Sequence, residues 1–191
     1  MLGRPRDIDL DKRLLAAGWS LLQSEGYAAL TLTTVASRAV AHRTDVYRRW
    51  RTKARLVVDV LDSHLPPISE VDTGELGSDL RAILADFAAS WSSSWIDGLV
   101  GLTADLQRDP DAELAFRAMA ERRGTPLHNA IVRAVSRGEI AENPNISLVA
   151  DAIEGPLMHR RMIGRQPLTP EYLDAIALVA YRALTTAAVT P

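Results

Sequence analysis

The 191-residue sequence predicts an all-α protein with a small N-terminal head and a larger C-terminal helical bundle. Aromatic residues make up 5% of the chain, runs that alternate apolar and polar residues are short, and Ala and Leu recur at helical spacing. This pattern disfavours strands and predicts about nine helices. Hydrophobic residues at 47% and charged residues at 24% are typical of a folded globular chain.

The first two helices of the head are predicted over residues 10–25 and 31–39. The first has a stripe of leucines on one face, with Asp9 as its N-cap and Gly26 as its C-terminal stop. Thr31 is a suitable N-cap for the second, because its hydroxyl can accept a hydrogen bond from an amide of the first turn. Each helix therefore has a local start signal.

A third and a fourth helix are predicted over residues 43–50 and 52–65, with Thr52 capping the fourth. The double proline Pro66-Pro67 ends the fourth helix, since proline lacks an amide hydrogen and restricts the residue before it. We place the domain boundary here. It gives a head over residues 1–65, including the connecting helix, and a body over residues 66–191.

Apolar residues at helical spacing predict five helices in the body, over residues 76–91, 96–107, 110–137, 147–163 and from 170 onward. Asp109-Pro110 and Thr169-Pro170 are start signals, with a cap residue followed by proline at the first helical position. Ser147 is predicted to cap its helix, and Gly155-Pro156 to bend it. The longest helix is either continuous or interrupted at residues 124–126, where Gly124 and Pro126 lie.

Charge is distributed unevenly between the two parts. Residues 1–65 hold 11 Lys and Arg against 7 Asp and Glu, a net charge of +4, whereas residues 66–191 hold 11 against 17, a net charge of −6. A basic head on an acidic body suits a protein that presents one end to nucleic acid. Ordinary scatter of charge is the alternative explanation.

The absence of cysteine excludes disulfides, thiolate nucleophiles and cysteine-ligated metals, and fits a reducing compartment. The N-terminal residues MLGRPRDIDLDKR lack the apolar core of a signal peptide, and no apolar run approaches the length of a membrane span. We therefore expect a cytoplasmic protein with no membrane partner.

A short helix, a tight connection and an arginine-rich second helix occupy residues 35–56. One face of the second helix can enter a DNA groove while the other is buried. The first face carries Thr44, Tyr47, Arg48 and Arg51, and the buried face carries Val46 and Trp50. Seven basic residues from Arg38 to Arg55, called the basic footprint below, stand against the single acid Asp45. This pattern predicts a helix-turn-helix that binds a phosphate backbone.

These motifs resemble the head of the TetR/AcrR family of transcriptional regulators. The matching motifs are Gly26-Tyr27, Val35-Ala36, Tyr47 with Trp50, and Thr52-Lys53. Residues 155–173 also resemble one class of ligand-binding bodies in that family. The resemblance implies a homodimer on paired DNA half-sites, and a repressor whose DNA binding is relieved by a small-molecule effector.

Two positions depart from the family pattern. Val40 stands where the family usually has glycine in the turn, and a β-branched residue is costly at positive φ, so the turn is either rearranged or strained. Asp45 stands where Thr or Ser is usual early in the recognition helix. Its charge either weakens DNA binding by repelling phosphate or accepts from a cytosine amino group.

Residues 43–48 are expected in the major groove, with Arg43 and Thr44 nearest base edges and Arg43 able to form two bonds to guanine. Phosphate contacts are assigned to Thr33, His42, Tyr47, Arg48 and Lys53. Arg4 and Arg6 are either an arm that reaches a neighbouring groove or a solvated terminus.

In the body, the final two helices are the expected dimer interface, with Ala177, Ala180 and Ala183 allowing close approach, unless these faces pack internally. The candidate effector contacts are Trp91, Trp95, Met158, His159 and Met162. Plain core packing is the alternative for the tryptophans, and a structural hydrogen bond is the alternative for His159. No cofactor is expected.

An enzyme is not predicted. The four histidines are dispersed without metal-ligand spacing, and glycine-rich phosphate loops and GxSxG elements are absent from the sequence. The remaining alternative to a regulator is a helical adaptor that binds only protein. It would show no salt-sensitive affinity for DNA, whereas a regulator must.

Overall fold

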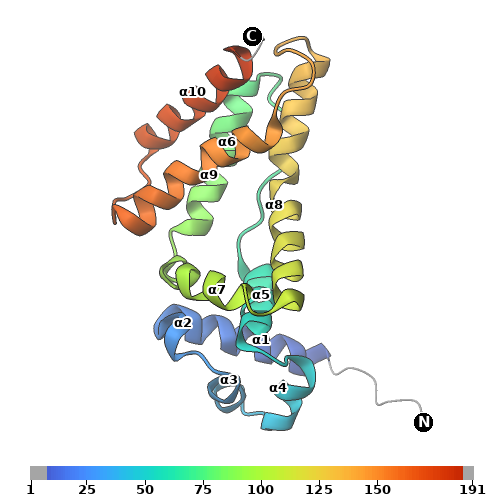
Figure 1. Cartoon of the computed structure of the whole chain (residues 1–191), viewed down its shortest axis with the longest axis vertical. Coiled ribbons are helices and arrows are strands. Elements are labelled where there is room, and N and C mark those ends of the chain that lie inside the picture. The colour runs from blue at the N-terminus through green and yellow to red at the C-terminus, as the bar shows by residue number, and fades with distance from the viewer. Residues whose placement is uncertain (1–7, 187–191) are drawn as a thin grey trace, which may run out of the picture. The chain divides into compact units, whose positions relative to one another are not determined.

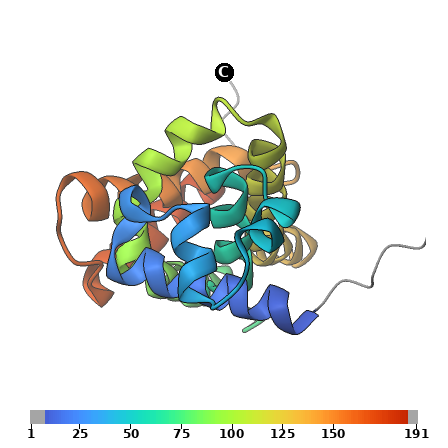
Figure 2. The ribbon, with the colours of Figure 1, turned by 90° about the horizontal axis from the view of Figure 1, so that it is seen from below.

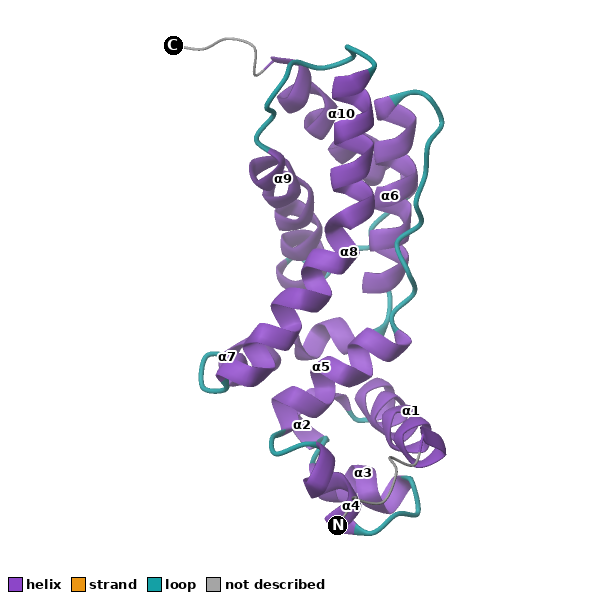
Figure 3. Cartoon of the chain, turned by 90° about the vertical axis from the view of Figure 1, so that its right-hand side faces the viewer, coloured by secondary structure: helices purple, strands orange, loops and turns teal. Residues whose placement is uncertain are grey.

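The computed structural model describes residues 8–186. Within that range, ten α-helices are joined by a 3₁₀ helix, a π-helix and loops, with no strand (Figure 1, Figure 3). The all-α prediction is confirmed. The helices pack as two compact units: residues up to Leu65 with Ser93–Met119, and Pro66–Ser92 with the residues from Ala120 onward. The first unit thus takes in a segment from beyond the predicted domain boundary.

The first unit begins with α1 (Ile8–Ser24), α2 (Gly26–Ala29), α3 (Leu32–Arg38), α4 (Arg43–Arg49) and α5 (Lys53–His64). α1 packs against α5 and α3, and Figure 2 shows α1 and α3 crossing. Gly18 lets α1 approach α5 closely, since a Cβ there would lie 2.7 Å from Cγ2 of Val60. The core contains the fully buried side chains of Leu14, Leu22, Val35, Val46 and Leu56.

The start predicted for the first helix needs correction, whereas its predicted stop at Gly26 is confirmed. α1 begins at Ile8, so Asp9 lies in its first turn and is not the N-cap. Gly26 has a φ of +77° and opens the additional short helix α2. This further turn buries Tyr27, which is 6% exposed, so burial of the ring accounts for a helix that the local pattern does not indicate.

The caps of two head helices are as predicted. The hydroxyl of Thr31 accepts from the amide of Thr34 at 3.0 Å in a capping box, and that of Thr52 accepts from the amide of Arg55 at 3.2 Å. In the body, Asn145 and not Ser147 caps its helix, because the Asn145 side chain accepts from the amide of Leu148 at 3.0 Å.

The segment Ser93–Met119 adds three elements to the first unit. They are the 3₁₀ helix η1 (Ser94–Gly98), the helix α7 (Leu99–Leu106) and the first turns of α8 (Pro110–Ser136). The helix predicted over 96–107 is therefore divided at Gly98, which packs directly on Tyr27.

The second unit contains α6 (Leu76–Trp91), the rest of α8, α9 (Ile146–Met158), η2 (His159–Ile163) and α10 (Pro170–Thr186). α10 packs along α6 and α9. α8 continues through Gly124 and Pro126, so the interruption left open there does not occur. The helix predicted over 147–163 changes at His159 to a π-helix, in which the amide of Gly164 donates to the His159 carbonyl at 2.9 Å.

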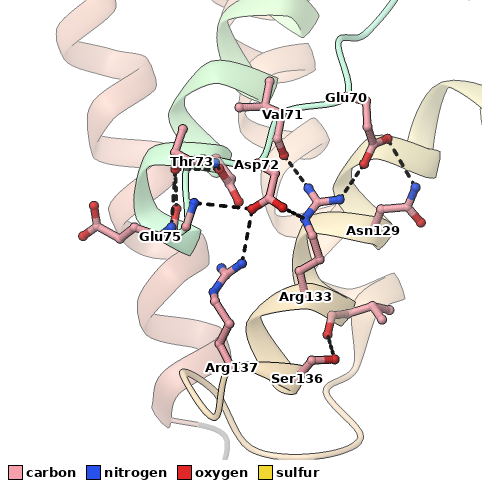
Figure 4. A network of polar contacts seen from close by, with 12 residues as sticks. Glu70, Val71, Asp72, Thr73, Glu75, Asn129, Arg133, Ser136 and Arg137 are labelled. Carbon is pink, nitrogen blue, oxygen red and sulfur yellow. Dashed lines mark hydrogen bonds and ion pairs between the residues drawn. The ribbon is translucent and has the colours of Figure 1, made fainter.

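Residues 69–75, called the strap below, lead into α6 and are held to α8 by charged groups (Figure 4). Arg133 of α8 donates to Oε1 of Glu70 at 2.6 Å and to the Val71 carbonyl. Its Nε lies 3.6 Å from Oδ2 of Asp72. One guanidinium thus contacts three consecutive residues of the strap.

The end of the strap is fixed by a buried carboxylate. Asp79 of α6 is 0% exposed, and its Oδ1 accepts from both the amide and the hydroxyl of Thr73 at 2.7 Å. Glu139 accepts from the amide of Leu76 at 2.8 Å and also pairs with Arg137 at 2.8 Å. Polar contacts, more than apolar burial, therefore hold this connection.

The turn between α3 and α4 places Val40 at a φ of +51°. Its amide donates to the Ser37 carbonyl at 3.2 Å, and the amide of Ala41 donates to the Ala36 carbonyl at 2.9 Å. This is a Schellman ending, with Val40 at the position that glycine favours. Val40 is 87% exposed, so packing does not compensate for the strain. Of the two expected outcomes, the turn is strained and not rearranged.

Replacing Val40 with glycine is expected to raise the free energy of unfolding by about 1 kcal/mol, because relief of the Cβ clash exceeds the added chain entropy. α8 ends in the same motif with Gly138 at a φ of +70°, and Gly138→Val is expected to destabilise by a similar amount. Denaturant unfolding measures the free energy of unfolding of both variants. A Val40→Gly variant no more stable than wild type would contradict the strain.

Candidate nucleic-acid interface

α4 presents one polar face and one buried face. Val46 is 0% exposed and Trp50 is 2% exposed, so both belong to the core of the first unit. The opposite side carries the exposed side chains of Arg43, Thr44, Tyr47 and Arg48. Tyr47 is 51% exposed, which is high for an aromatic side chain. α4 therefore offers hydrogen-bonding groups suited to the edges and backbone of DNA.

Arg49 points inward, although the sequence places it in the basic footprint. Its side chain is 6% exposed, its Nε pairs with Asp11 of α1, and its Nη1 donates to the Asp45 carbonyl at 2.9 Å. The pair links α4 to α1. Removing either partner would leave the other charge buried and unpaired, which is strongly destabilising. Arg49 is a positioning residue and not part of the footprint.

Carboxylates also pair with three other basic residues of the footprint. These pairs are Arg38 with Glu25 at 2.9 Å, Arg48 with Asp45 at 2.8 Å, and Arg55 with Asp59 at 3.2 Å. Within the described residues, Arg43 and Arg51 form no ion pair. The uncompensated positive charge of the footprint is therefore smaller than its composition indicates.

Asp45 is an internal partner of the arginines of α4. Its Oδ1 accepts from Nη2 of Arg48 at 2.8 Å and lies 4.0 Å from Nη1 of Arg49, with the side chain 22% exposed. Its charge is compensated within the helix, which reduces its repulsion of a phosphate. Both roles that the sequence left open for Asp45 concern the complex with DNA and stay predictions.

The three remaining predicted contacts differ in exposure. His42 is exposed at the N-cap of α4, and Thr33 is half-buried on α3. Lys53 is half-buried at the start of α5, with its Nζ 3.9 Å from the centroid of the Tyr27 ring and 3.4 Å from the Ala28 carbonyl. Burial lowers the pKa of Lys53, and the nearby carboxylate of Asp105 partly opposes this effect.

Tyr27 and Asp105 join the head to α7, and sequence reasoning missed this contact. The Tyr27 hydroxyl donates to Oδ2 of Asp105 at 2.6 Å, across 78 residues of sequence. Burial of the phenol raises the pKa of Tyr27, and the bond to Asp105 raises it further. Tyr27 was noted as part of a family motif, but its partner has no local sequence signal.

Of the candidate effector contacts, Trp91 and Trp95 are buried, Met162 is half-buried, and Met158 and His159 are exposed. Trp91 and Trp95 lie on different helices, because α6 ends at Trp91 and Trp95 lies in η1. Met158 ends α9, while His159 and Met162 belong to the π-helix. The structure does not place these five residues on one regular helix.

From residue 8 to residue 186, no cluster of three or more His, Asp or Glu side chains is arranged to hold a metal ion. Over the same range, no helix has the length and apolar character needed to cross a bilayer. Arg4 and Arg6, considered above as an arm, lie outside the described residues.

Comparison with known proteins gives matches over both parts of the chain. The model of bacterial regulatory proteins of the tetR family matches residues 14–60, and that of the tetracyclin repressor-like C-terminal domain matches residues 70–187. The uncharacterized HTH-type transcriptional regulator YdeS of Bacillus subtilis is 28% identical, over 94% of this chain and 92% of its own length.

A second relative and a solved structure agree with these matches. The DNA-binding transcriptional repressor TetR of Mycobacteroides abscessus is 30% identical, over 88% of this chain and 92% of its own length. The crystal structure of the TetR family transcription regulator SCO0332 has a TM-score of 0.71 and 24% identity, over 96% of this chain and 100% of that one. Regulators of this family act by binding DNA and are not enzymes. The chain therefore belongs to the TetR family and is a DNA-binding transcriptional regulator.

Proposed function

We propose that this regulator is a repressor that binds a palindromic operator as a homodimer and is released by a small-molecule effector. The exposed face of α4 carries the proposal, since Arg43 has no carboxylate partner within the described residues and Tyr47 projects from the same face. The relative from Mycobacteroides abscessus bears the name of a repressor. Two copies of such a head would read half-sites about 34 Å apart or a multiple of that.

Within this proposal, Arg43 and Thr44 contact base edges, because the N-terminal turn of a recognition helix approaches them most closely. Thr33, His42, Tyr47, Arg48 and Lys53 contact phosphates. Arg48 must turn from Asp45, or share its guanidinium with it, to reach a phosphate, since the two side chains already pair at 2.8 Å. Lys53 must likewise leave the ring of Tyr27, from which its Nζ lies 3.9 Å.

The experiment that tests the proposal is selection from a random duplex library with the purified protein at near-physiological salt, followed by sequencing. Recovery of a palindromic motif supports a dimeric, sequence-specific regulator and gives its operator. Recovery of no motif, with no salt-sensitive DNA binding, contradicts the proposal and favours the helical adaptor.

Arg43→Ala is expected to lower discrimination between the operator and its single-base variants by about 1–3 kcal/mol at the position that Arg43 reads. Lys53→Met is expected to weaken operator and random duplexes alike and to reduce the salt dependence by about one counterion. Fluorescence anisotropy at several salt concentrations measures both variants. Equal loss of specific and random binding in both would show that the assigned roles are wrong.

For the dimer, we propose the outward face of α9, η2 and α10. Its exposed apolar side chains are Leu148, Met158, Ile163, Leu178 and Val179. Ala177 and Ala180, which the sequence assigned to close approach between copies, are buried at 3% and 1% because α10 packs on α6 and α9 within one chain. The neighbouring face, with Leu178 and Val179, takes their place in the proposal.

Val179→Glu is expected to convert a dimer to a monomer at micromolar concentration, because Val179 is 53% exposed on the proposed face and a charge there would be buried on association. Leu114→Glu is the matched control, since Leu114 is 70% exposed on α8 in the first unit and should leave the dimer intact. Sedimentation velocity distinguishes the two variants. A monomeric wild type would count against the dimer.

The effector is assigned to the body, and Trp91, Trp95, Met158, His159 and Met162 remain its candidate contacts. Such a ligand acts by binding more tightly to the form of the dimer that fits DNA poorly. Displacement of the operator by a compound, together with a change in tryptophan fluorescence, is the result that supports this part of the proposal.

A further inference from the structure

We propose that Asp105 of α7 restrains the ammonium group of Lys53 and thereby lowers the affinity of the head for DNA of any sequence. The inference rests on the proposed function, in which Lys53 contacts a phosphate. Asp105 is a positioning residue in this scheme and does not itself touch DNA.

The restraint is built around the ring of Tyr27. The hydroxyl of Tyr27 donates to Oδ2 of Asp105 at 2.6 Å, and the Nζ of Lys53 lies 3.9 Å from the centroid of the same ring. The ammonium also donates to the Ala28 carbonyl at 3.4 Å, a long bond. Carboxylate, phenol and ammonium thus form one cluster, in which the aromatic face and the negative charge both favour a cation.

The close packing of η1 and α7 fixes the position of Asp105 relative to this ring. A Cβ at Gly98 would lie 2.5 Å from the Cβ of Tyr27, and a Cβ at Gly101 would lie 2.8 Å from its Cδ1. Tyr27 is 6% exposed. Backbone and ring are therefore in direct contact, and neither Asp105 nor Tyr27 can move far without disturbing the other.

A carboxylate in this place opposes phosphate binding through Lys53. It attracts the ammonium toward α2 and so holds it away from an approaching phosphate. Arg108 also faces Asp105, with its Nη1 4.0 Å from Oδ1, but Arg108 is 80% exposed and compensates for little of the charge. Because a phosphate contact carries no sequence information, the effect should be the same on operator and random DNA.

Because the chain has few lysines, the ammonium group of Lys53 can be observed directly by NMR. Only Lys12 and Lys53 are lysines, and the other basic residues counted with them are arginines. Reductive methylation with ¹³C-formaldehyde therefore labels two side chains and the terminal amine, and retains their positive charge. The resonance of Lys53 is expected to be shifted by the ring of Tyr27, whereas that of Lys12 is not.

The test compares Asp105→Asn, Lys53→Met and the double variant on the selected operator and on a random duplex by fluorescence anisotropy. Asparagine can still accept from the Tyr27 hydroxyl, so the fold is preserved while the charge is lost. Asp105→Asn should tighten binding to both duplexes about three- to fivefold in the wild-type background and leave it unchanged in the Lys53→Met background. Asp111→Asn, an exposed carboxylate of the same unit, controls for net charge and should change nothing.

The proposal is overturned if Asp105→Asn leaves DNA binding unchanged or weaker, or tightens it equally without Lys53. The NMR titration needs no DNA: in Asp105→Asn the Lys53 resonance should titrate at lower pH than in wild type, because a stabilising negative charge is lost. An unchanged Lys53 titration also overturns the restraint. Failure of wild type to bind any duplex would contradict the proposed function instead, and the NMR result would still decide whether Asp105 holds Lys53.

Discussion

Replacing Arg133 with methionine is expected to lower the free energy of unfolding by about 3 kcal/mol, which corresponds to a fall of roughly 6–12 °C in Tm. Methionine keeps the apolar stem of the side chain but removes the bonds to Glu70 and Val71. It also leaves Asp79, 0% exposed, without a nearby positive charge that helps to balance it. Thermal unfolding followed by circular dichroism measures the change.

Arg117→Met is the matched control for this variant. Arg117 pairs with Glu113 one turn earlier on α8, but its side chain is 70% exposed, whereas that of Arg133 is 26% exposed. The control should therefore change the stability by no more than about 0.5 kcal/mol. Similar losses in the two variants would mean that the strap contributes no more than an ordinary surface ion pair.

The same network predicts a dependence on acid. The bond from Arg133 holds the pKa of Glu70 below its usual value, and burial opposes this effect. A carboxyl with a depressed folded pKa contributes stability above its unfolded pKa, and this is lost as the pH falls through the folded value. Between about pH 5 and about pH 2, wild type should therefore lose more stability than Arg133→Met. A steeper loss in the variant would contradict the assigned pairing.

Gly98→Ala is expected to destabilise the first unit by about 2–3 kcal/mol. The added Cβ would lie 2.5 Å from the Cβ of Tyr27, an atom that cannot rotate away, so the backbone of η1 or α2 must shift. The bond from Tyr27 to Asp105 would be strained with it. Denaturant unfolding, followed by tryptophan fluorescence, reports the loss.

Gly124→Ala is the matched control, and it is expected to raise the stability that Gly98→Ala lowers. Gly124 lies inside α8, and a Cβ there would meet no atom within 4 Å, so alanine should stabilise the helix by about 0.5–1 kcal/mol. If both substitutions shifted the midpoint in the same direction, close contact at Tyr27 would not be the cause.

Local signals in the sequence predicted much of the fold, because caps and prolines act over a few residues. Thr31 and Thr52 begin their helices, and α5 ends at His64, shortly before Pro66-Pro67. α2 was not predictable in the same way. It exists where Tyr27 is buried against η1 and α7, and that contact joins residues far apart in the sequence.

The residues of the candidate interface also differ in whether a local pattern could predict their positions. Helical periodicity was sufficient to place Val46 and Trp50 in the core and Tyr47 on the surface. It could not show that Arg49 turns inward, because its partner Asp11 lies 38 residues away in α1. A local pattern cannot show a pair between residues far apart in the sequence, so the pairs of Arg38 with Glu25 and of Arg49 with Asp11 were not predictable.

The internal pairing of these basic residues affects how the regulator is distributed in a cell. A chromosome presents about 10⁶–10⁹ competing sites, and a strongly basic head would be held on them. Here Arg49 is buried, and Arg38, Arg48 and Arg55 are each paired with a carboxylate. A larger share of molecules should then remain unbound and available to the operator, so that few copies per cell suffice for its occupancy.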